Sequence, residues 1–367
     1  MTDLNKQFIE QITQAKEQNT SLHICGGNSK SFLVDIDKAQ EVDELSTEGH
    51  SGIINYLPSE LTITVRSGTP LIEVQQALAD KGQMLPFEPP MYDEKSTIGG
   101  VIASGLSGAR RPFSGSVRDF VLGTEVINGK AELLRFGGEV MKNVAGYDVS
   151  RLMVGAQGRL GLISSVSLKV LPVSEKEQSI AIEMASEQFF DTVQQWMQQS
   201  YPLSAAVYYG EKAYFRFSAS ESFIEQIIKN ISSKFSGLLS PVDNQFWSQI
   251  NNQTHDFFKD ASNRNLLKVL LPMYLKEVFS KEFAPKEAMQ IIDWGGACRW
   301  LYTVQSIESI RQHAEIFEGT AQVFRDNGQY SSSCVREHPR ANAIAQLEMR
   351  IQQQFDPQKI FNRHYAN

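Results

Sequence analysis

The hydrophobic positions in the first half of the chain follow helical spacing in some segments and form short extended runs in others. Leu4, Phe8 and Ile12 recur on one helix face, which predicts a helix over residues 4–18. LHIC (22–25) then predicts one short strand, and INYLPSELTITVRSG (54–68) predicts two strands around a turn at Pro58. Helices and short strands therefore alternate in this half.

A second helix in this half is marked at both of its ends. Thr69 is expected to be its N-cap, Pro70 suits the first helical position, and Gly82 is expected to stop it. An extended, proline-stiffened loop, LPFEPP (85–90), follows this helix. It leads into STIGGVIASGLSG (96–108), in which six residues have little or no side chain: Gly99, Gly100, Ala103, Ser104, Gly105 and Gly108.

The second half alternates strands and helices in a different order. Its predicted helices are SEQFFDTVQQWMQQ (186–199), ESFIEQIIKNISSKF (221–235) and SIESIRQHAEIFEG (306–319). Its predicted strands are EQSIAIEMA (177–185), LSAAVYY (203–209), AYFRFSA (213–219), NLLKVLLP (265–272), MQIIDW (289–294), RWLYTV (299–304) and TAQVFR (320–325). This pattern predicts an α+β domain with an antiparallel, ferredoxin-like arrangement of sheet and helices.

Length and glycine distribution predict two domains. A chain of 367 residues exceeds the usual size of one core. Nineteen of the 25 glycines lie at or before Gly161. We therefore expect a boundary near Pro172, with VSEKEQS (173–179) as a charged linker.

Composition excludes several classes of protein. The net charge of −7 gives no electrostatic footprint for nucleic acid. No apolar run is long enough to span a membrane, and the polar N-terminus is unlike a signal or transit peptide. Three scattered cysteines, Cys25, Cys298 and Cys334, are typical of a reducing cytoplasm and exclude an iron–sulfur site held by this chain alone. The histidines His50, His255, His313, His338 and His364 are isolated, so no metal site is expected.

Three glycine-rich stretches are candidates for a nucleotide site. CGGNSKSF (25–32) follows a strand and could form a nest of backbone N–H groups for phosphate oxygens; the alternative is a tight turn. The small residues of 96–108 would let a flat ring or a diphosphate approach the backbone; the alternative is a close contact between helices. GYDVSRLMVGAQGRLGLI (146–163) places a helix-like piece before its glycines, which excludes a Rossmann turn and leaves two turns around a short helix as the alternative.

The order of these stretches carries a family resemblance. GGNSKSF, LPFEPP, TIGGVIASG, SGSVRDFVLGTEVINGK and RFGGEVMKNVAGYDVSRLMVGAQGRLGLI follow one another as in the FAD-binding domain of the vanillyl-alcohol-oxidase, or PCMH, type. Within that family, the last two stretches and IIDWGGACRWL (291–301) are most similar to the smaller flavin subunits of bacterial glycolate oxidases. The resemblance implies a PCMH-type FAD-binding domain over 1–175, a cap domain over 176–332 and a tail, 333–367, that returns to the FAD domain.

The resemblance also implies which residues bind FAD. The pyrophosphate would be held by backbone N–H groups of Gly26, Gly27, Asn28, Ser29 and Lys30. The diphosphate, ribityl chain and ring would lie along Thr97, Gly99, Gly100, Ser104 and Gly105, with Gly161, Leu162 and Ile163 touching the ring or the adenine. His23 and Cys25 are expected to be buried strand residues rather than flavin links, so FAD would be bound non-covalently.

The expected activity is that of an FAD-dependent oxidoreductase acting on a CH–OH group. The resemblance implies a subunit that works with a catalytic flavin subunit and an iron–sulfur subunit, oxidising glycolate or D-lactate to the 2-oxo acid. It also implies a cytoplasmic protein, held at the inner face of the membrane only through that complex. This chain lacks the histidine cluster of the large flavin subunits, so its catalytic residues are unknown and its role would be to relay electrons. The alternatives are a free-standing flavin oxidoreductase and a non-enzymatic assembly subunit with a vestigial pocket.

Cations outside the glycine stretches are the other candidates for chemistry. Arg110, Arg111 and Arg118 could hold a substrate carboxylate, but a solvated or partner-facing basic patch is the preferred interpretation. Arg299, beside the Trp294–Gly295–Gly296 turn, is a further cation without an assigned role.

Overall fold

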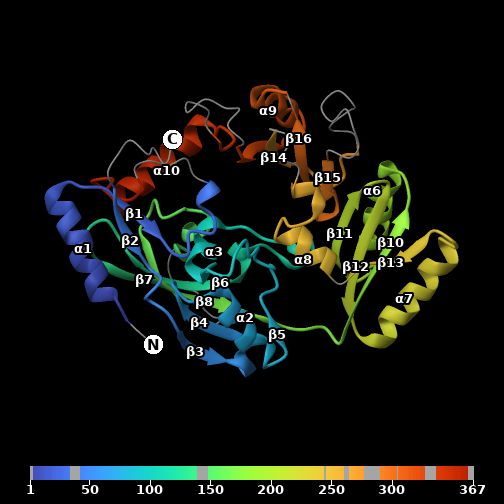
Figure 1. Ribbon diagram of the computed structural model, residues 1–367, viewed down its shortest axis with the longest axis horizontal. Coiled ribbons are helices and arrows are strands. Elements are labelled where there is room, and N and C mark those ends of the chain that lie inside the picture. Colours follow the sequence, from blue (N-terminus) through green and yellow to red (C-terminus); the bar gives the residue numbers. More distant parts are fainter. Residues whose placement is uncertain are drawn as a thin grey trace. The chain divides into compact units, whose positions relative to one another are not determined.

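The computed structural model describes residues 3–33, 42–138, 148–243, 245–259, 264–276, 290–303, 305–326 and 336–362. The chain forms two compact units (Figure 1). The first comprises Met1–Ser107, Gly115–Val173 and Arg340–Asn367, and the second comprises Gly108–Ser114 and Ser174–Pro339. The chain therefore crosses to the second unit within 108–114, a segment that we expected in the first domain.

An antiparallel sheet forms the centre of the first unit, in the order β3-β4-β8-β6-β7. Its strands are β3 (Ile53–Leu57), β4 (Thr62–Arg66), β6 (Val121–Ile127), β7 (Leu133–Gly137) and β8 (Leu162–Lys169). Smaller pairings add β1 (Leu22–Cys25), parallel to β2 (Asp43–Ser46), and β5 (Gln83–Met84), antiparallel to β9 (Leu171–Pro172). The helices are α1 (Asn5–Gln18), α2 (Leu71–Ala79), α3 (Ile98–Ser104), α5 (Val117–Phe120) and α10 (Asn342–Phe355).

Two apolar clusters hold the first unit together. The larger joins α2 and α3 to the sheet through residues such as Val74, Ile102 and Val166. The smaller buries the Phe8 and Ile12 face of α1, as the helical spacing predicted, together with Ile360 of the tail. The C-terminal segment is thus part of this core.

The described part of the tail is bonded to β1. The amide of Leu22 donates to the Ile360 carbonyl at 2.8 Å, and the amide of Asn362 donates to the Leu22 carbonyl at 2.9 Å. The Asn362 side chain accepts from the Ile24 amide at 2.9 Å and donates to the Gln157 carbonyl at 2.7 Å. Arg363 and His364 lie outside the described residues, as does the predicted stretch 139–147.

The second unit is built on one antiparallel sheet in the order β13-β10-β12-β11-β15-β16-β14-β17 (Figure 1). Its strands are β10 (Lys176–Glu183), β11 (Leu203–Tyr209), β12 (Lys212–Ala219), β13 (Leu239–Pro241), β14 (Asn265–Leu270), β15 (Gln290–Asp293), β16 (Cys298–Thr303) and β17 (Thr320–Arg325). Its helices are α4 (Arg111–Ser114), α6 (Ser186–Gln198), α7 (Glu221–Lys234), α8 (Gln245–Asn251) and α9 (Ile307–Glu315). The α+β arrangement with an antiparallel sheet is the predicted one.

Some boundaries differ from those predicted. Thr69 does not cap α2, because its hydroxyl donates to the Arg66 carbonyl at 2.7 Å and accepts from the Gly52 amide at 2.8 Å. Pro70 is the N-cap instead, and α2 begins one residue later. Part of the expected linker, from Lys176 onward, is strand β10, because its backbone pairs with β12. The helix-like piece expected before the glycines of 146–163 is only a 3₁₀ turn, Ser150–Met153.

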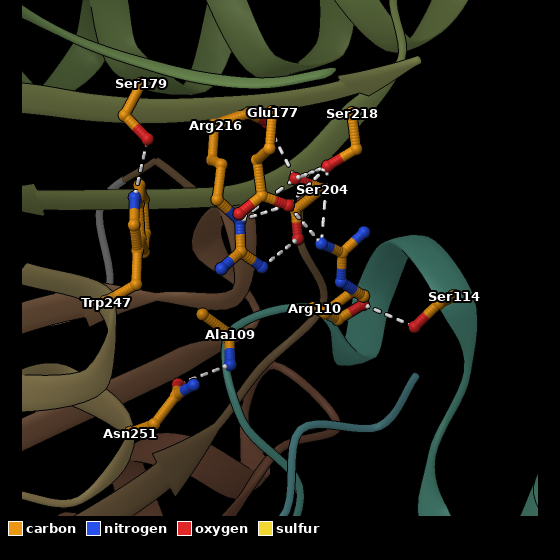
Figure 2. Close-up of polar contacts among 10 residues, drawn as sticks. All are labelled: Ala109, Arg110, Ser114, Glu177, Ser179, Ser204, Arg216, Ser218, Trp247 and Asn251. Atoms are coloured by element: carbon orange, nitrogen blue, oxygen red, sulfur yellow. Dashed lines mark hydrogen bonds and ion pairs between the residues drawn. The ribbon is translucent and has the colours of Figure 1, made fainter. Parts of the chain in front are cut away.

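Arg110 anchors the crossing segment to the sheet of the second unit (Figure 2). Its guanidinium donates to the Glu177 carboxylate and to the Ser218 hydroxyl, the latter at 3.3 Å. The same Glu177 oxygen lies 3.6 Å from Nε of Arg216, whose guanidinium lies 5.1 Å from the ring centre of Trp247. Arg110 is only 7% exposed, so the expectation of a solvated basic patch is wrong for this residue. Arg118, by contrast, is exposed.

Candidate functional site

The first unit contains a pocket where the glycine-rich segments meet. Its walls come from the loop after β1, the start of α3 and the turns before β8. The space between the walls, counted together with the open solvent at its mouth, is about 850 Å³. The candidate residues that line it are Gly26, Gly27, Asn28, Ser29, Lys30, Thr97, Gly99, Gly100, Ser104, Gly161 and Ile163.

The loop after β1 needs glycine at two positions. A Cβ on Gly27 would lie 1.7 Å from the Lys95 carbonyl oxygen, and one on Gly26 would lie 2.5 Å from Oγ1 of Thr97. Neither position has room for a side chain, so the loop passes against the 95–97 segment with bare backbone. Asn28 then adopts a left-handed conformation, with φ of 52°. Backbone therefore forms this wall of the pocket.

Helix α3 supplies a second wall of small residues. Thr97 caps the helix, because its hydroxyl accepts from the Gly100 amide at 3.2 Å. Gly99 is packed against Ser67, whose Cβ would lie 2.7 Å from an added Cβ. Gly100 is different, since an added Cβ would meet only the Thr97 hydroxyl, at 3.4 Å. The space beside Gly100 is thus left open for whatever occupies the pocket.

Lys30 is the only lysine or arginine among the described residues that line the pocket. Its Nζ lies 3.4 Å from the Ser29 hydroxyl and 5.8 Å from the ring centre of Tyr92. Burial lowers the pKa of Lys30 to about 8, and the nearby Asp93 carboxylate opposes this shift. An anion beside Lys30 would offset its desolvation, as the phosphates of a nucleotide would do.

Two candidates do not line the pocket. Leu162 is fully buried in the cluster that contains Phe8 and Ile12, because neighbouring residues of a strand point to opposite faces. Gly105 ends α3 with φ of 64°, and a Cβ there would lie 3.2 Å from the Gly155 backbone. Its lack of a side chain serves the helix end and this close approach rather than the pocket.

Several lining residues were not among the candidates taken from the sequence. Thr47 and Ser67 reach the pocket because they follow β2 and β4, whose positions depend on strand pairing. Gly158 belongs to the glycine series before β8, which was the available clue for this turn. Its φ is 76°, and an added Cβ would lie 2.4 Å from the Asn362 side chain.

Cys25 and His23 also line the pocket. The Cys25 thiol donates to the Glu44 carboxylate at 2.7 Å. Burial and then the Glu44 carboxylate raise the pKa of this thiol to about 12, so it stays protonated and is a poor nucleophile. This environment supports the expectation that the cofactor is not linked through Cys25.

The described part of the chain contains neither a cluster of metal-ligating side chains nor a helix that could span a membrane. There, no group of three His, Cys, Asp or Glu side chains is placed to hold a metal ion. No helix among the same residues has the length and apolar character needed to cross a bilayer.

Arg299 has a structural environment in the second unit. It is 2% exposed and donates to the carbonyls of Gly296 and Leu275, the latter at 3.2 Å. Its guanidinium lies 5.0 Å from the ring centre of Phe190. Arg299 therefore fixes the Trp294–Gly296 turn.

Comparison with solved structures identifies the fold. Alkyldihydroxyacetonephosphate synthase, in two crystal forms, gives TM-scores of 0.68 and 0.67 at 13% and 14% identity. Each comparison covers 97% of this chain and 74% of the other. The likeness confirms the predicted fold class, a PCMH-type FAD-binding domain with a smaller antiparallel cap.

Residues 5–137 match the family described as FAD binding domain. FAD is accordingly the cofactor of this domain, and the pocket suits it in its glycine walls and in the lysine that lines it. Partial similarity extends to glycolate oxidase subunit GlcD of Bacillus subtilis (strain 168), 37% identical over 35% of this chain and 27% of the relative. D-lactate dehydrogenase of Anaerostipes hadrus is 30% identical over the same shares, 35% and 27%.

One similarity extends over the whole chain. Glycolate oxidase subunit GlcE of Escherichia coli (strain K12) is 39% identical over 370 residues, which cover 99% of this chain and 98% of the relative. The similarity therefore extends over both units of the chain. The chain belongs to the family of the glycolate oxidase subunit GlcE.

Proposed function

We propose that this chain is the FAD-binding subunit of a glycolate oxidase complex, which oxidises glycolate, or D-lactate, to the 2-oxo acid. The observation that carries the proposal is similarity to GlcE over the full length of both chains. The open, glycine-walled pocket in the first unit supports the proposal. A pocket filled by the protein's own side chains would instead have favoured a vestigial site.

Different residues of the pocket would bind different parts of FAD. The loop 26–30 would donate backbone N–H groups to the pyrophosphate, with the Lys30 ammonium beside it. Thr97, Gly99, Gly100 and Ser104 would lie along the rest of the cofactor, and Gly161 and Ile163 would close the opposite wall. Bound FAD supplies the capacity to accept two electrons from a CH–OH group, while the protein determines its position and surroundings.

The partners in this proposal are a catalytic flavin subunit and an iron–sulfur subunit. Cys25 and Cys298 are buried free thiols, one in each unit, and burial raises the pKa of both to about 12. Neither is suited to bind iron as a thiolate, so a separate subunit would hold the cluster. This chain would occupy an electron-transfer path between its partners, in the cytoplasm and at the inner membrane face only through the complex.

Purification of the tagged chain from its own cells tests the proposal. We expect two other subunits to co-purify with the chain. The complex should show a flavin absorbance spectrum, and denaturation should release the flavin as FAD. Glycolate should reduce the flavin in the intact complex. The isolated, FAD-loaded chain should be reduced by glycolate far more slowly. Equal rates for the isolated chain and the complex would favour a free-standing oxidoreductase. A chain that stays colourless after incubation with FAD would favour an assembly role.

A further inference from the structure

Asn362 lies in the tail at the point where the chain runs beside β1. Phe361 forms a parallel bridge with Leu22 of that strand, and the Asn362 amide donates to the Leu22 carbonyl at 2.9 Å. The other edge of β1 pairs with β2. The tail therefore satisfies backbone groups of β1 that β2 does not reach. Asn362 itself is only 3% exposed.

The Asn362 side chain binds the next amide along the same edge of β1. Its Oδ1 accepts from the Ile24 amide at 2.9 Å. Leu22 and Ile24 are two residues apart, so their amides point to the same edge of the strand. Ile24 lines the pocket and comes just before the loop 25–30, which forms the first wall. Oδ1 of Asn362 thus holds the strand end from which this wall starts.

The nitrogen of the same side chain binds the turn before β8. Nδ2 of Asn362 donates to the Gln157 carbonyl at 2.7 Å. Gln157 and Gly158 both line the pocket, and their φ values are 52° and 76°. A Cβ on Gly158 would lie 2.4 Å from Nδ2 of Asn362, so this approach requires glycine there. One amide side chain therefore joins two walls of the pocket.

The turn before β8 is also bonded to the wall that α3 forms. The Gly155 amide donates to the Ile102 carbonyl at 3.0 Å, and the Gln157 amide donates to the Ala103 carbonyl at 2.9 Å. Ala103 is a lining residue as well. The strand end of β1, the turn and α3 are thus connected in series, and Asn362 links the first two.

The backbone that carries Asn362 is itself fixed. The fully buried Asp356 carboxylate accepts from the amides of Ile360 and Phe361, at 3.0 Å and 2.9 Å. Both of these residues are packed in the apolar cluster that buries one face of α1. Asn362 has φ of 46°, a left-handed conformation that asparagine adopts more readily than most residues. Its side chain therefore extends from a well-supported backbone, as a group that orients others must.

We propose that Asn362 is a positioning residue for FAD: it holds the strand end of β1 and the 157–158 turn at the separation that the cofactor needs, without lining the pocket itself. This inference rests on FAD binding in this pocket, as proposed above. Without the bridge, the two walls would sample other separations, and only a fraction of the chains would be ready to bind. The apparent affinity for FAD would fall by that fraction. The tail would thereby set how tightly the subunit holds its flavin.

Equilibrium titration of the FAD-free, full-length chain with FAD tests this role. Asn362→Gly keeps the left-handed backbone but removes both side-chain bonds, so we expect FAD binding to weaken by about tenfold or more. The visible circular dichroism of the bound flavin should change as well, because the walls around it move. Hydrogen exchange of the Ile24 amide, measured without FAD, should become faster in the same variant.

Asn362→Asp separates the two halves of the bridge. It retains an acceptor for the Ile24 amide, so exchange at Ile24 should stay slow. Its carboxylate has no N–H for the Gln157 carbonyl, so the turn is released and FAD binding should still weaken. Unchanged FAD affinity in both Asn362 variants would overturn the inference, as would unchanged exchange at Ile24 in Asn362→Gly.

Asn128→Ala is the matched control. Asn128 is a 2% exposed asparagine of the same unit, and its Oδ1 accepts from the amides of Lys130 and Glu132 at 2.9 Å and 3.0 Å. This variant should melt at a lower temperature but bind FAD as the natural chain does. A loss of FAD affinity as large as that of Asn362→Gly would overturn the specific role of Asn362. These measurements use the chain alone, so a failure to co-purify partners or to be reduced by glycolate would refute the proposed complex without affecting them. A natural chain that binds no FAD would refute both.

Discussion

The carbonyl oxygen of Lys95 lies 1.7 Å from the point where a Cβ on residue 27 would sit. The corresponding point on Gly100, across the same pocket, has nothing nearer than the Thr97 hydroxyl at 3.4 Å. One glycine is thus required by the protein's own packing, whereas the other leaves space that only a ligand would use.

This contrast yields a prediction about two alanine variants. Gly100→Ala should fold at least as stably as the natural chain, because alanine favours a helix by about 1 kcal/mol over glycine. It should nevertheless lose FAD affinity by about tenfold or more, since the methyl group enters the pocket. Gly27→Ala should lose both stability and FAD. Thermal unfolding without FAD and flavin absorbance per chain distinguish the two, and normal FAD content in Gly100→Ala would show that the cofactor lies elsewhere.

Lys30 predicts a pH-dependent affinity for FAD. Its pKa is lowered to about 8 by burial, and an adjacent pyrophosphate would raise it again. Binding would then favour the protonated lysine, so FAD affinity should fall as the pH rises from 8 to 9.5. Equilibrium titrations of FAD across this range measure the slope. Lys30→Met should bind FAD more weakly at pH 7 and lack the slope; an unchanged slope would assign it to another group.

His50 predicts a loss of stability in mild acid. Its Nδ1 accepts from the Leu4 amide at 3.0 Å and its Nε2 lies 3.1 Å from the Ser164 hydroxyl, which in turn donates to the Asn5 side chain at 2.7 Å. This bonding requires a neutral ring, and burial lowers the pKa of His50 below 6.5.

The sign follows from proton binding. Just below pH 6.5 the unfolded chain protonates His50 while the folded chain does not, so stability should fall with pH by up to about 1.4 kcal/mol per unit. His255 and His338 also have lowered pKa values, so a difference measurement is needed. Urea unfolding between pH 5 and 8 should show a shallower slope for His50→Asn, together with lower stability at pH 8. If the stability of His50→Asn and of the natural chain changed equally with pH, His50 would not be the group responsible.

The Glu177 carboxylate is expected to stabilise the second unit. Its carboxylate serves both Arg110 and Arg216, which are 7% and 4% exposed. Glu177→Gln would remove the carboxylate that both buried guanidiniums share and should cost about 1–3 kcal/mol, moderated because the Glu177 side chain is 42% exposed. Denaturant unfolding measures this cost. Glu183→Gln removes a surface ion pair and should change stability by less than about 0.5 kcal/mol; similar losses in both variants would rule out a special role for Glu177.

The sequence by itself determined the elements of both units and the nature of the pocket. Alternation and helical spacing report which side of a segment is buried, so strands such as β10, β14 and β17 and helices α1, α6, α7 and α9 were predictable. Glycines at 26, 27, 99 and 161 are required because other atoms approach the backbone closely there, whereas Gly100 leaves space in the pocket. All five marked the pocket walls.

The tertiary structure decided which of these segments meet. Thr47 and Ser67 join the pocket through strand pairing, and Leu162 leaves it because its strand turns that side chain into the core. The burial of Arg110 beside Glu177, and of Lys268 among aromatic rings, likewise depends on partners distant along the chain. Periodicity records whether a residue is buried, but its neighbours are set by the register and packing of elements that local sequence does not specify.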